Sequence, residues 1–376
     1  MKNMISWFDF SFWGNEKSYV NEALDSTWVS GGTYIEKFEK ELEKKLNLPN
    51  AFVVSNGTAA LQLAFLTIEL HPGDEVIVPA YGFMAAANVL KLMNVTPVFV
   101  DVDEYHWCIS SAKIKNKITN KTKAIVVIHN YGVIAEINEI AEIARNNNLY
   151  LIEDCAEATF SKYNNKYCGT FGDLSTFSFH ATKTISTGEG GMVSCKDPIL
   201  ADRLKLIRSH GLRRDKVHYW HEYFGNNFRM SNILAAIGFG QLEMISDILV
   251  EKSRVLSRYK SNLSDISGIH LQGYHKETNP VIWAVAIYIN PDRFQISRDD
   301  VMRKMGDIGI ECRPGFYTPN QLDIYKNLST SVNVIANKLA ENIIVLPSSP
   351  RLKDSQIDFI TESLIKIIKD DQINKQ

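Results

Sequence analysis

The sequence has few cysteines, and they are scattered. Five occur among 376 residues, and no two of them form a Cys-x-x-Cys pair. An odd, dispersed set of thiols argues against a disulfide framework and against a zinc site of the usual ligand spacing. It indicates a reducing compartment. We therefore expect no bound metal and a cytoplasmic protein.

The chain also lacks a strong net charge and a long apolar run. Its formal net charge of −2 gives no global field that would attract nucleic acid or an acidic membrane surface. No stretch approaches the roughly 18–20 uninterrupted apolar residues of a membrane helix. The N-terminal segment has neither the apolar core nor the cleavage site of a secretory signal. We expect neither a nucleic-acid partner nor a membrane partner.

Between about residues 50 and 155, short apolar runs alternate with helix-like stretches. The runs are apolar at both odd and even positions, as in strands whose two faces are covered by helices. This alternation predicts a mostly parallel α/β sheet. The expected strands are 51–54, 75–78, 96–100, 124–128 and 149–152.

After about Arg229 the pattern changes. A long helical stretch is expected over 231–263, followed by a strand over 281–289. Further helices are expected over 297–305, 334–344 and 355–368. This order predicts a smaller α+β lobe, with a large domain at 1–240 and a small C-terminal domain at 241–376.

A possible anion site lies at Ser55-Asn-Gly-Thr-Ala-Ala-Leu61. A glycine at a helix start exposes backbone N–H groups, and the helix dipole favours an anion there. Gly57 and Thr58 would supply these groups. A plain helix cap explains the same residues when they are read alone.

A carboxylate follows the expected strand 149–152. Asp154 lies just past its C-terminal end, which is the sheet edge where ligands bind in open α/β sheets. It could pair with a protonated ring nitrogen. A helix-capping role is an equally good interpretation of this residue in isolation.

Lys183 lies in the segment 177–191, after a short aromatic strand and before the glycine-rich loop 186–191. A lone lysine is usually a solvated surface residue. Flanking glycines and small hydroxyl residues change that expectation, because they allow the backbone to approach a bulky ligand closely.

Together these segments resemble the sugar-nucleotide aminotransferases of the DegT/DnrJ group. Segments 28–39, 311–317 and 346–347 match the terminal blocks of that family, so the resemblance covers nearly the whole chain. Several motifs in the right order are far more specific than one glycine-rich match. The resemblance implies the aspartate-aminotransferase fold (PLP fold type I), with a mostly parallel central sheet and a smaller α+β C-terminal domain.

The resemblance also implies pyridoxal 5'-phosphate as cofactor, with pyridoxamine 5'-phosphate as its intermediate form. Lys183 matches the lysine that holds the cofactor as a Schiff base. Asp154 matches the residue that keeps the pyridine nitrogen protonated, and Phe83 matches the aromatic that stacks on the ring. Glu157 falls where the family places a polar residue beside the phenolic oxygen.

The same resemblance implies which residues bind the phosphate group of the cofactor. Gly57, Thr58 and Ser178 match phosphate-binding positions. Asn227 matches a residue that reaches the phosphate from the neighbouring subunit. This implies a homodimer with active sites at the subunit interface.

Transamination requires a proton to leave a carbon next to nitrogen, and the cofactor delocalises the resulting charge. A lysine amine can then carry the proton between two carbons. By resemblance, L-glutamate is the amino donor and a keto compound the acceptor.

Two alternatives to amino transfer remain open. A sister branch of dehydratases carries histidine at the lysine position, whereas this chain has Lys183 there and His180 three residues earlier. This favours transamination, with His180 either handling protons, contacting substrate or serving as a hydrogen-bonded structural histidine. A non-catalytic sensor of the cofactor is the second alternative, and the Asp154 and Lys183 pair argues against it.

The acceptor is expected to be a nucleotide-linked 4-keto-6-deoxysugar used in surface-polysaccharide biosynthesis. The loop around Glu189 resembles the branch that acts on 4-keto sugars. The segments 129–132, 180–182 and 317–320 depart from the family pattern, and a histidine-to-asparagine change at Asn320 alters hydrogen-bond geometry. A small phosphorylated ketone such as dihydroxyacetone phosphate is therefore an alternative acceptor. The expected substrate contacts are Tyr317, Asn320, Arg313 and Glu189.

Overall fold

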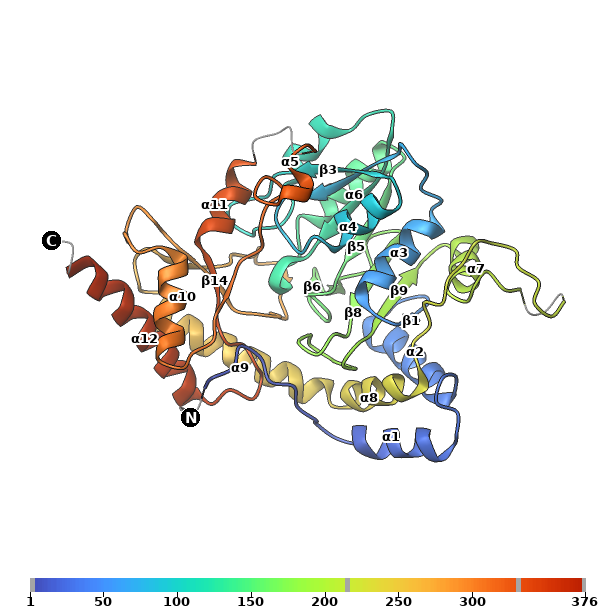
Figure 1. Ribbon diagram of the computed structural model, residues 1–376, viewed down its shortest axis with the longest axis horizontal. Coiled ribbons are helices and arrows are strands. Elements are labelled where there is room, and N and C mark those ends of the chain that lie inside the picture. The colour runs from blue at the N-terminus through green and yellow to red at the C-terminus, as the bar shows by residue number, and fades with distance from the viewer. Residues whose placement is uncertain (1–3, 214–216, 329–332, 374–376) are drawn as a thin grey trace.

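The computed structural model describes residues 4–213, 217–328 and 333–373 (Figure 1). Its centre is a seven-stranded sheet in the order β1-β9-β8-β5-β4-β2-β3. Five neighbouring strands from β3 to β8 run parallel, while β9 runs antiparallel to both β8 and β1. The strands are β1 Phe52–Val54, β2 Glu75–Pro79, β3 Thr96–Val100, β4 Thr122–Ile128, β5 Tyr150–Asp154, β8 Leu174–Ser178 and β9 Gly191–Cys195.

Alternate residues of each strand face opposite layers of helices. In β2, Val76 and Val78 belong to one apolar core while Ile77 belongs to the other. The apolar residues at both odd and even positions of these strands follow from this two-sided burial, because both faces must exclude water. Helices α3 Gly57–Thr67, α4 Ala85–Leu92 and α7 Pro198–Ile207 cover the first face; α2 Thr33–Leu46, α6 Ile137–Asn146 and α8 Asn232–Glu243 cover the second.

The helix sequences match these positions. Helix α6 buries only one stripe, formed by Ile137, Ile140, Ile143 and Ala144, the spacing of an amphipathic helix against a sheet. Helix α7 begins with Asp197 as N-cap, whose carboxylate accepts from two backbone N–H groups, and with Pro198 in its first turn.

The C-terminal part has its own core around an antiparallel sheet in the order β10-β12-β14-β13. Arg258 and Asp358 join two of its helices through paired contacts of 2.7 and 2.6 Å. Its elements are α9 Ile245–Leu263, β10 Ile269–Leu271, β12 Ala286–Ile289, α10 Arg298–Asp307, β13 Arg313–Pro314, α11 Val334–Asn342, β14 Ile343–Val345 and α12 Asp354–Ile373.

Smaller elements complete the described chain. A three-stranded sheet pairs the returning segment β11 with a hairpin of the large domain. These elements are α1 Glu16–Asp25, α5 Ser111–Ile114, η1 Lys115–Lys117, η2 Asn130–Gly132, β6 Lys162–Tyr163, β7 Lys166–Tyr167, β11 Thr278–Asn279 and η3 Asp323–Tyr325.

Three expectations about the C-terminal part need correction. The predicted helix 231–263 is two helices, because the chain leaves helical geometry at Met244 and the axes of α8 and α9 differ by 66°. The expected strand 281–289 begins only at Ala286, since the preceding residues turn towards the large sheet. Helix α11 ends at Asn342, where β14 begins.

The predicted division at 240/241 falls inside α8 and remains a proposal. Among the described residues, no single helix is long and apolar enough to cross a membrane; α8 and α9 meet that test only as a bent pair.

Candidate active site

Several predicted residues meet at the carboxyl edge of the large sheet. Asp154 ends β5, Ser178 ends the neighbouring β8, and Lys183 lies in the loop between β8 and β9. Parallel strands end at the same edge, which explains why residues from separate segments come together. Within this loop, the backbone N–H of Lys183 donates a hydrogen bond to the His180 carbonyl at 2.9 Å.

The amine of Lys183 is enclosed rather than solvated. Its Nζ lies 3.8 Å from Glu157 Oε1 and 3.7 Å from the centre of the Trp283 ring. Burial lowers the pKa of Lys183, while Glu157 and Asp154 oppose this shift. A lysine in this environment gives up its proton more readily than a surface lysine, which is what a nucleophilic or basic amine requires.

Both carboxyl groups near Lys183 are buried. Burial raises the pKa of Glu157 to about 7, against the opposing influence of Lys183. The backbone N–H of Tyr131 donates to Glu157 Oε2 at 2.7 Å and holds it in place. Burial also raises the pKa of Asp154, although the Ala156 N–H at 3.1 Å favours its charged form. Such an acid ionises when a positively charged group approaches it.

The neighbouring residue shows how β5 separates two carboxylates. Glu153 faces the opposite side of the strand and accepts backbone N–H bonds from Gly169, Phe171 and Gly172, at 2.6–2.8 Å. His129 Nε2 lies 3.2 Å from it. All of these contacts are internal, so Glu153 has a structural role and Asp154 is left to face the site.

The residues of the predicted anion site lie at the start of α3. Asn56 caps the helix by accepting from Ala59 N–H at 2.8 Å, and the first-turn N–H groups have no partner within a helix. Gly57 lies against β8, where a Cβ atom would approach Ser178 Cβ to 2.9 Å. The glycine therefore allows α3 and Ser178 to lie side by side. Thr58, next in the helix, is exposed.

Phe83 lies on the loop after β2 and is 62% exposed. Its ring packs at the edge of Phe316, with centroids 6.3 Å apart. A large aromatic side chain left this accessible next to the carboxyl edge of a sheet is well placed to stack on a planar ligand.

A cavity of about 420 Å³ borders Thr182, next to Lys183 in the chain. Its walls are largely aromatic, with Arg313 and Glu311 forming a charged pair at one side. Arg313, one of the predicted substrate contacts, lines this cavity. His180 also lines it, and His180 Nε2 lies 3.9 Å from Oε1 of Glu189, another predicted contact. The lining includes Trp7, Phe8, Tyr131, Trp283 and Phe316.

The other predicted substrate residues lie elsewhere. Tyr317 is half-exposed, and the Arg298 guanidinium lies 5.8 Å from its ring. Neither Tyr317 nor Asn320 lines the aromatic cavity. Asn227 lies between α7 and α8, where its backbone pairs with that of Ser209; it stands two residues before Arg229, which pairs with Val54 of β1.

Two residues of the site carry no sequence signal. Trp283, under the Lys183 amine, lies in an apolar run that reads as a plain strand. Lys252 lies within a helix among several other charged residues. An indole in an apolar run, and one buried lysine on a helix whose other charged residues are exposed or half-buried, give no pattern that marks them beforehand.

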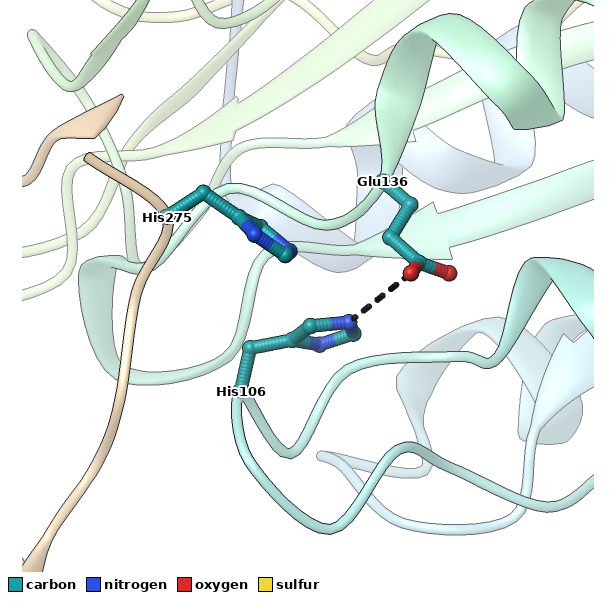
Figure 2. A group of neighbouring side chains, drawn as sticks. All are labelled: His106, Glu136 and His275. Atoms are coloured by element: carbon teal, nitrogen blue, oxygen red, sulfur yellow. Dashed lines mark ion pairs between the residues drawn. The ribbon is translucent and has the colours of Figure 1, made fainter. Parts of the chain in front are cut away.

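A second group of polar side chains lies apart from Lys183: His106, Glu136 and His275 (Figure 2). Their nearest ligand atoms lie within 4.8 Å of one another, with His106 Nε2 3.9 Å from Glu136 Oε1. Tetrahedral zinc bonds of about 2.0–2.1 Å would bring ligand atoms to roughly 3.3 Å. His106 Nδ1 also accepts the Cys108 N–H at 3.2 Å, so a neutral ring carries its proton on Nε2. The geometry favours a polar contact over metal ligation.

Comparison with known proteins gives a consistent result. Residues 13–365 match the model of the DegT/DnrJ/EryC1/StrS aminotransferase family. The chain is 43% identical to GDP-perosamine synthase of Escherichia coli O157:H7 over 361 residues, covering 96% of this chain and 97% of the relative.

Solved structures share the fold over nearly their whole length. Helicobacter pylori PseC, an aminotransferase involved in the biosynthesis of pseudoaminic acid, superposes with a TM-score of 0.93 at 26% identity, covering 98% of this chain and 100% of that one. An Escherichia coli GDP-4-keto-6-deoxy-D-mannose-3-dehydratase with bound hydrated PLP superposes with a TM-score of 0.88 at 25% identity, covering 96% of this chain and 100% of that one.

Proposed function

We propose that this chain, which belongs to the DegT/DnrJ/EryC1/StrS aminotransferase family, aminates a nucleotide-linked 4-keto-6-deoxysugar with L-glutamate as the amino donor. The chain is a pyridoxal-phosphate-dependent aminotransferase, and the expected family, fold and cofactor are confirmed. The observation that carries the acceptor proposal is 43% identity to GDP-perosamine synthase across nearly the whole chain.

The residues at the sheet edge fit the cofactor. The start of α3 offers N–H groups and positive dipole to a phosphate, and the close contact of Gly57 with Ser178 sets a hydroxyl beside them. Buried Asp154 suits a protonated ring nitrogen, and exposed Phe83 suits a stacked ring. When bound, the cofactor supplies the electron sink for charge on the carbon next to nitrogen.

The protein's own groups then manage placement and protons. With a lowered pKa, the Lys183 amine can accept a proton and return it to a neighbouring atom. Glu157 pairs with that amine while Tyr131 N–H fixes the carboxylate, which would stand beside the phenolic oxygen of the bound cofactor as the family resemblance implies. A lysine at 183, where the dehydratase branch has histidine, supports amino transfer over deoxygenation.

The aromatic cavity supports a sugar acceptor. Aromatic walls suit the apolar face of a sugar ring, and Arg313 can pair with a diphosphate, for which a guanidinium is a good partner. A three-carbon phosphorylated ketone would leave most of these walls without contact. We assign Arg313 and His180, which line the cavity, to the acceptor, with Glu189 beside His180; the cavity gives no such support for Tyr317 and Asn320.

We also propose a homodimer in the cytoplasm, with Asn227 reaching the partner's phosphate site. The segment that carries Asn227 also carries Phe224, which is fully exposed, and Tyr219 and Trp220, which are largely exposed. Exposed aromatic groups on one extended segment are typical of a surface that another chain covers.

The test is to convert the enzyme to its amine form with glutamate, remove the donor, and add candidate acceptors. Return of the visible absorbance with GDP-, UDP- or dTDP-linked 4-keto-6-deoxysugars would identify the nucleotide. Return only with dihydroxyacetone phosphate would contradict the sugar proposal. A protein that binds cofactor but never reacts with glutamate would instead support the sensor alternative.

A further inference from the structure

Trp283 contacts Lys183, the loop that carries Lys183 and the turn at Tyr131 through three different groups. Its ring lies under the Lys183 amine at 3.7 Å, and its indole N–H donates to the Thr182 carbonyl at 2.8 Å. Its backbone N–H donates to the Tyr131 carbonyl, also at 2.8 Å. The same residue therefore touches the reactive amine, the loop that carries it and the strand-end turn that holds Glu157.

The Trp283 ring has little freedom to move. Tyr131 lies parallel to it, at 8° and 6.3 Å between centroids, and Trp7 packs edge-on at 83° and 5.6 Å. An indole held between two aromatic rings and fixed by its N–H offers a defined surface to a cation.

Lys252 supports Trp283 from behind. It lies on α9, is 5% exposed, and donates from Nζ to the Trp283 carbonyl at 3.2 Å. Within the described ranges, its ammonium forms no ion pair, although a buried charge normally requires one. Burial, with Lys183 adding to it, lowers the pKa of Lys252 to about 7.

Lys252 and Lys183 line the same narrow crevice, together with Asp9 of the N-terminal segment. The other charged groups that face Lys183 are Asp154 and Glu157, from the end of β5. Two buried lysines on one crevice repel each other when both are charged, so their protonation is coupled. Asp154 and Glu157 stand beside Lys183, whereas Lys252 forms no ion pair in the described part of the chain and shares the crevice with Asp9.

We propose that Trp283 and Lys252 are positioning residues for Lys183: Trp283 holds the amine on its indole face, and Lys252 fixes Trp283 and, in its protonated form, adds a positive charge to the crevice that it shares with the lysine nitrogen. This inference rests on the assignment of Lys183 as the residue that binds the cofactor. Because α9 continues into the core of the C-terminal part through Val255 and Tyr259, the contact also ties that part to the reactive amine.

The Trp283 role is tested by cofactor capture rather than turnover. Apoenzyme is mixed rapidly with pyridoxal phosphate, and growth of the visible band of the lysine-bound cofactor is timed. Trp283→Leu removes the indole face and the bond to Thr182, and capture should slow about tenfold because the amine is no longer oriented. Trp283→Phe keeps an aromatic face and should recover most of the rate.

The Lys252 role is tested by the pH at which that visible band changes. Lys252→Met removes the positive charge that Lys252 carries below a pH of about 7, so the lysine nitrogen should keep its proton to a higher pH. Lys252→Gln, which loses the charge but keeps a donor, should shift the band in the same direction. Lys260→Met is the control, because Lys260 lies on the same helix and contacts Tyr274 instead.

The possible outcomes are distinct. If Trp283→Leu captures the cofactor at the wild-type rate, the role of Trp283 is overturned. If the pH at which the visible band changes is the same in both Lys252 variants as in the wild type, the role of Lys252 is overturned. Circular dichroism and thermal unfolding show whether each variant is folded. Trp283→Phe replaces Trp283→Leu in the test if the latter does not fold, and Lys252→Gln likewise replaces Lys252→Met. If Lys183→Ala still develops the visible band, the Lys183 assignment fails instead.

Discussion

Replacing Glu157 by glutamine is expected to lower the pKa of Lys183 in the cofactor-free protein. Glutamine keeps the shape of the side chain and an oxygen that can accept the Tyr131 N–H. It removes the negative charge that lies 3.8 Å from Lys183 Nζ. Loss of a nearby opposite charge disfavours the ammonium form, so the lysine releases its proton at lower pH.

The size of the effect follows from that distance. Two unit charges 3.8 Å apart attract by about 4 kcal/mol at an effective dielectric constant near 20, which corresponds to about three pKa units. Glu157 has a pKa of about 7, so it is only partly charged near neutrality, and Asp154 keeps acting on the lysine in the variant. We therefore expect a decrease of about one to two units.

The assay follows reaction of the apoenzyme with a small amine reagent across pH, with peptide mapping to isolate modification at Lys183. The pH of half-maximal reactivity should fall in Glu157→Gln. Glu142→Gln, an exposed position on α6, should leave it unchanged. An unmoved or higher midpoint in Glu157→Gln would show that the carboxylate does not act on this amine.

Other expected outcomes concern the cofactor site. Lys183→Ala should abolish both the visible band of the bound cofactor and turnover, and normal transaminase activity in that variant would refute the assignment. Gly57→Ala should weaken cofactor affinity by roughly 1–3 kcal/mol in a binding titration, since its Cβ would lie 2.9 Å from Ser178 Cβ; a small residue at 178 that restores affinity would establish the steric cause. Asp154→Asn should retain cofactor yet lose most turnover with glutamate, because a neutral amide cannot stabilise a protonated ring nitrogen; unchanged kcat would count against that role.

Local signals explain why the large sheet was predictable. Each strand from 51 to 152 contains a short run of consecutive apolar residues, because both of its faces are buried. The C-terminal part was less predictable at its boundaries. Helical periodicity continues through Met244, and the change of direction between α8 and α9 depends on which core each helix must reach, information that a local pattern does not contain.

The same distinction holds for the site. By itself the sequence determined the reaction class, since Lys183, Asp154 and Gly57 each stand in a motif whose order along the chain is diagnostic, and the family match agrees with it. Only the tertiary structure brought Trp283 to Lys183 and Lys252 to Trp283. The two residues lie on separate segments about 70 to 100 residues beyond Lys183, and these contacts form only when α9 and the run before β12 fold beside the large sheet. It also separated Asp154 from Glu153, since the strand turns adjacent carboxylates to opposite faces.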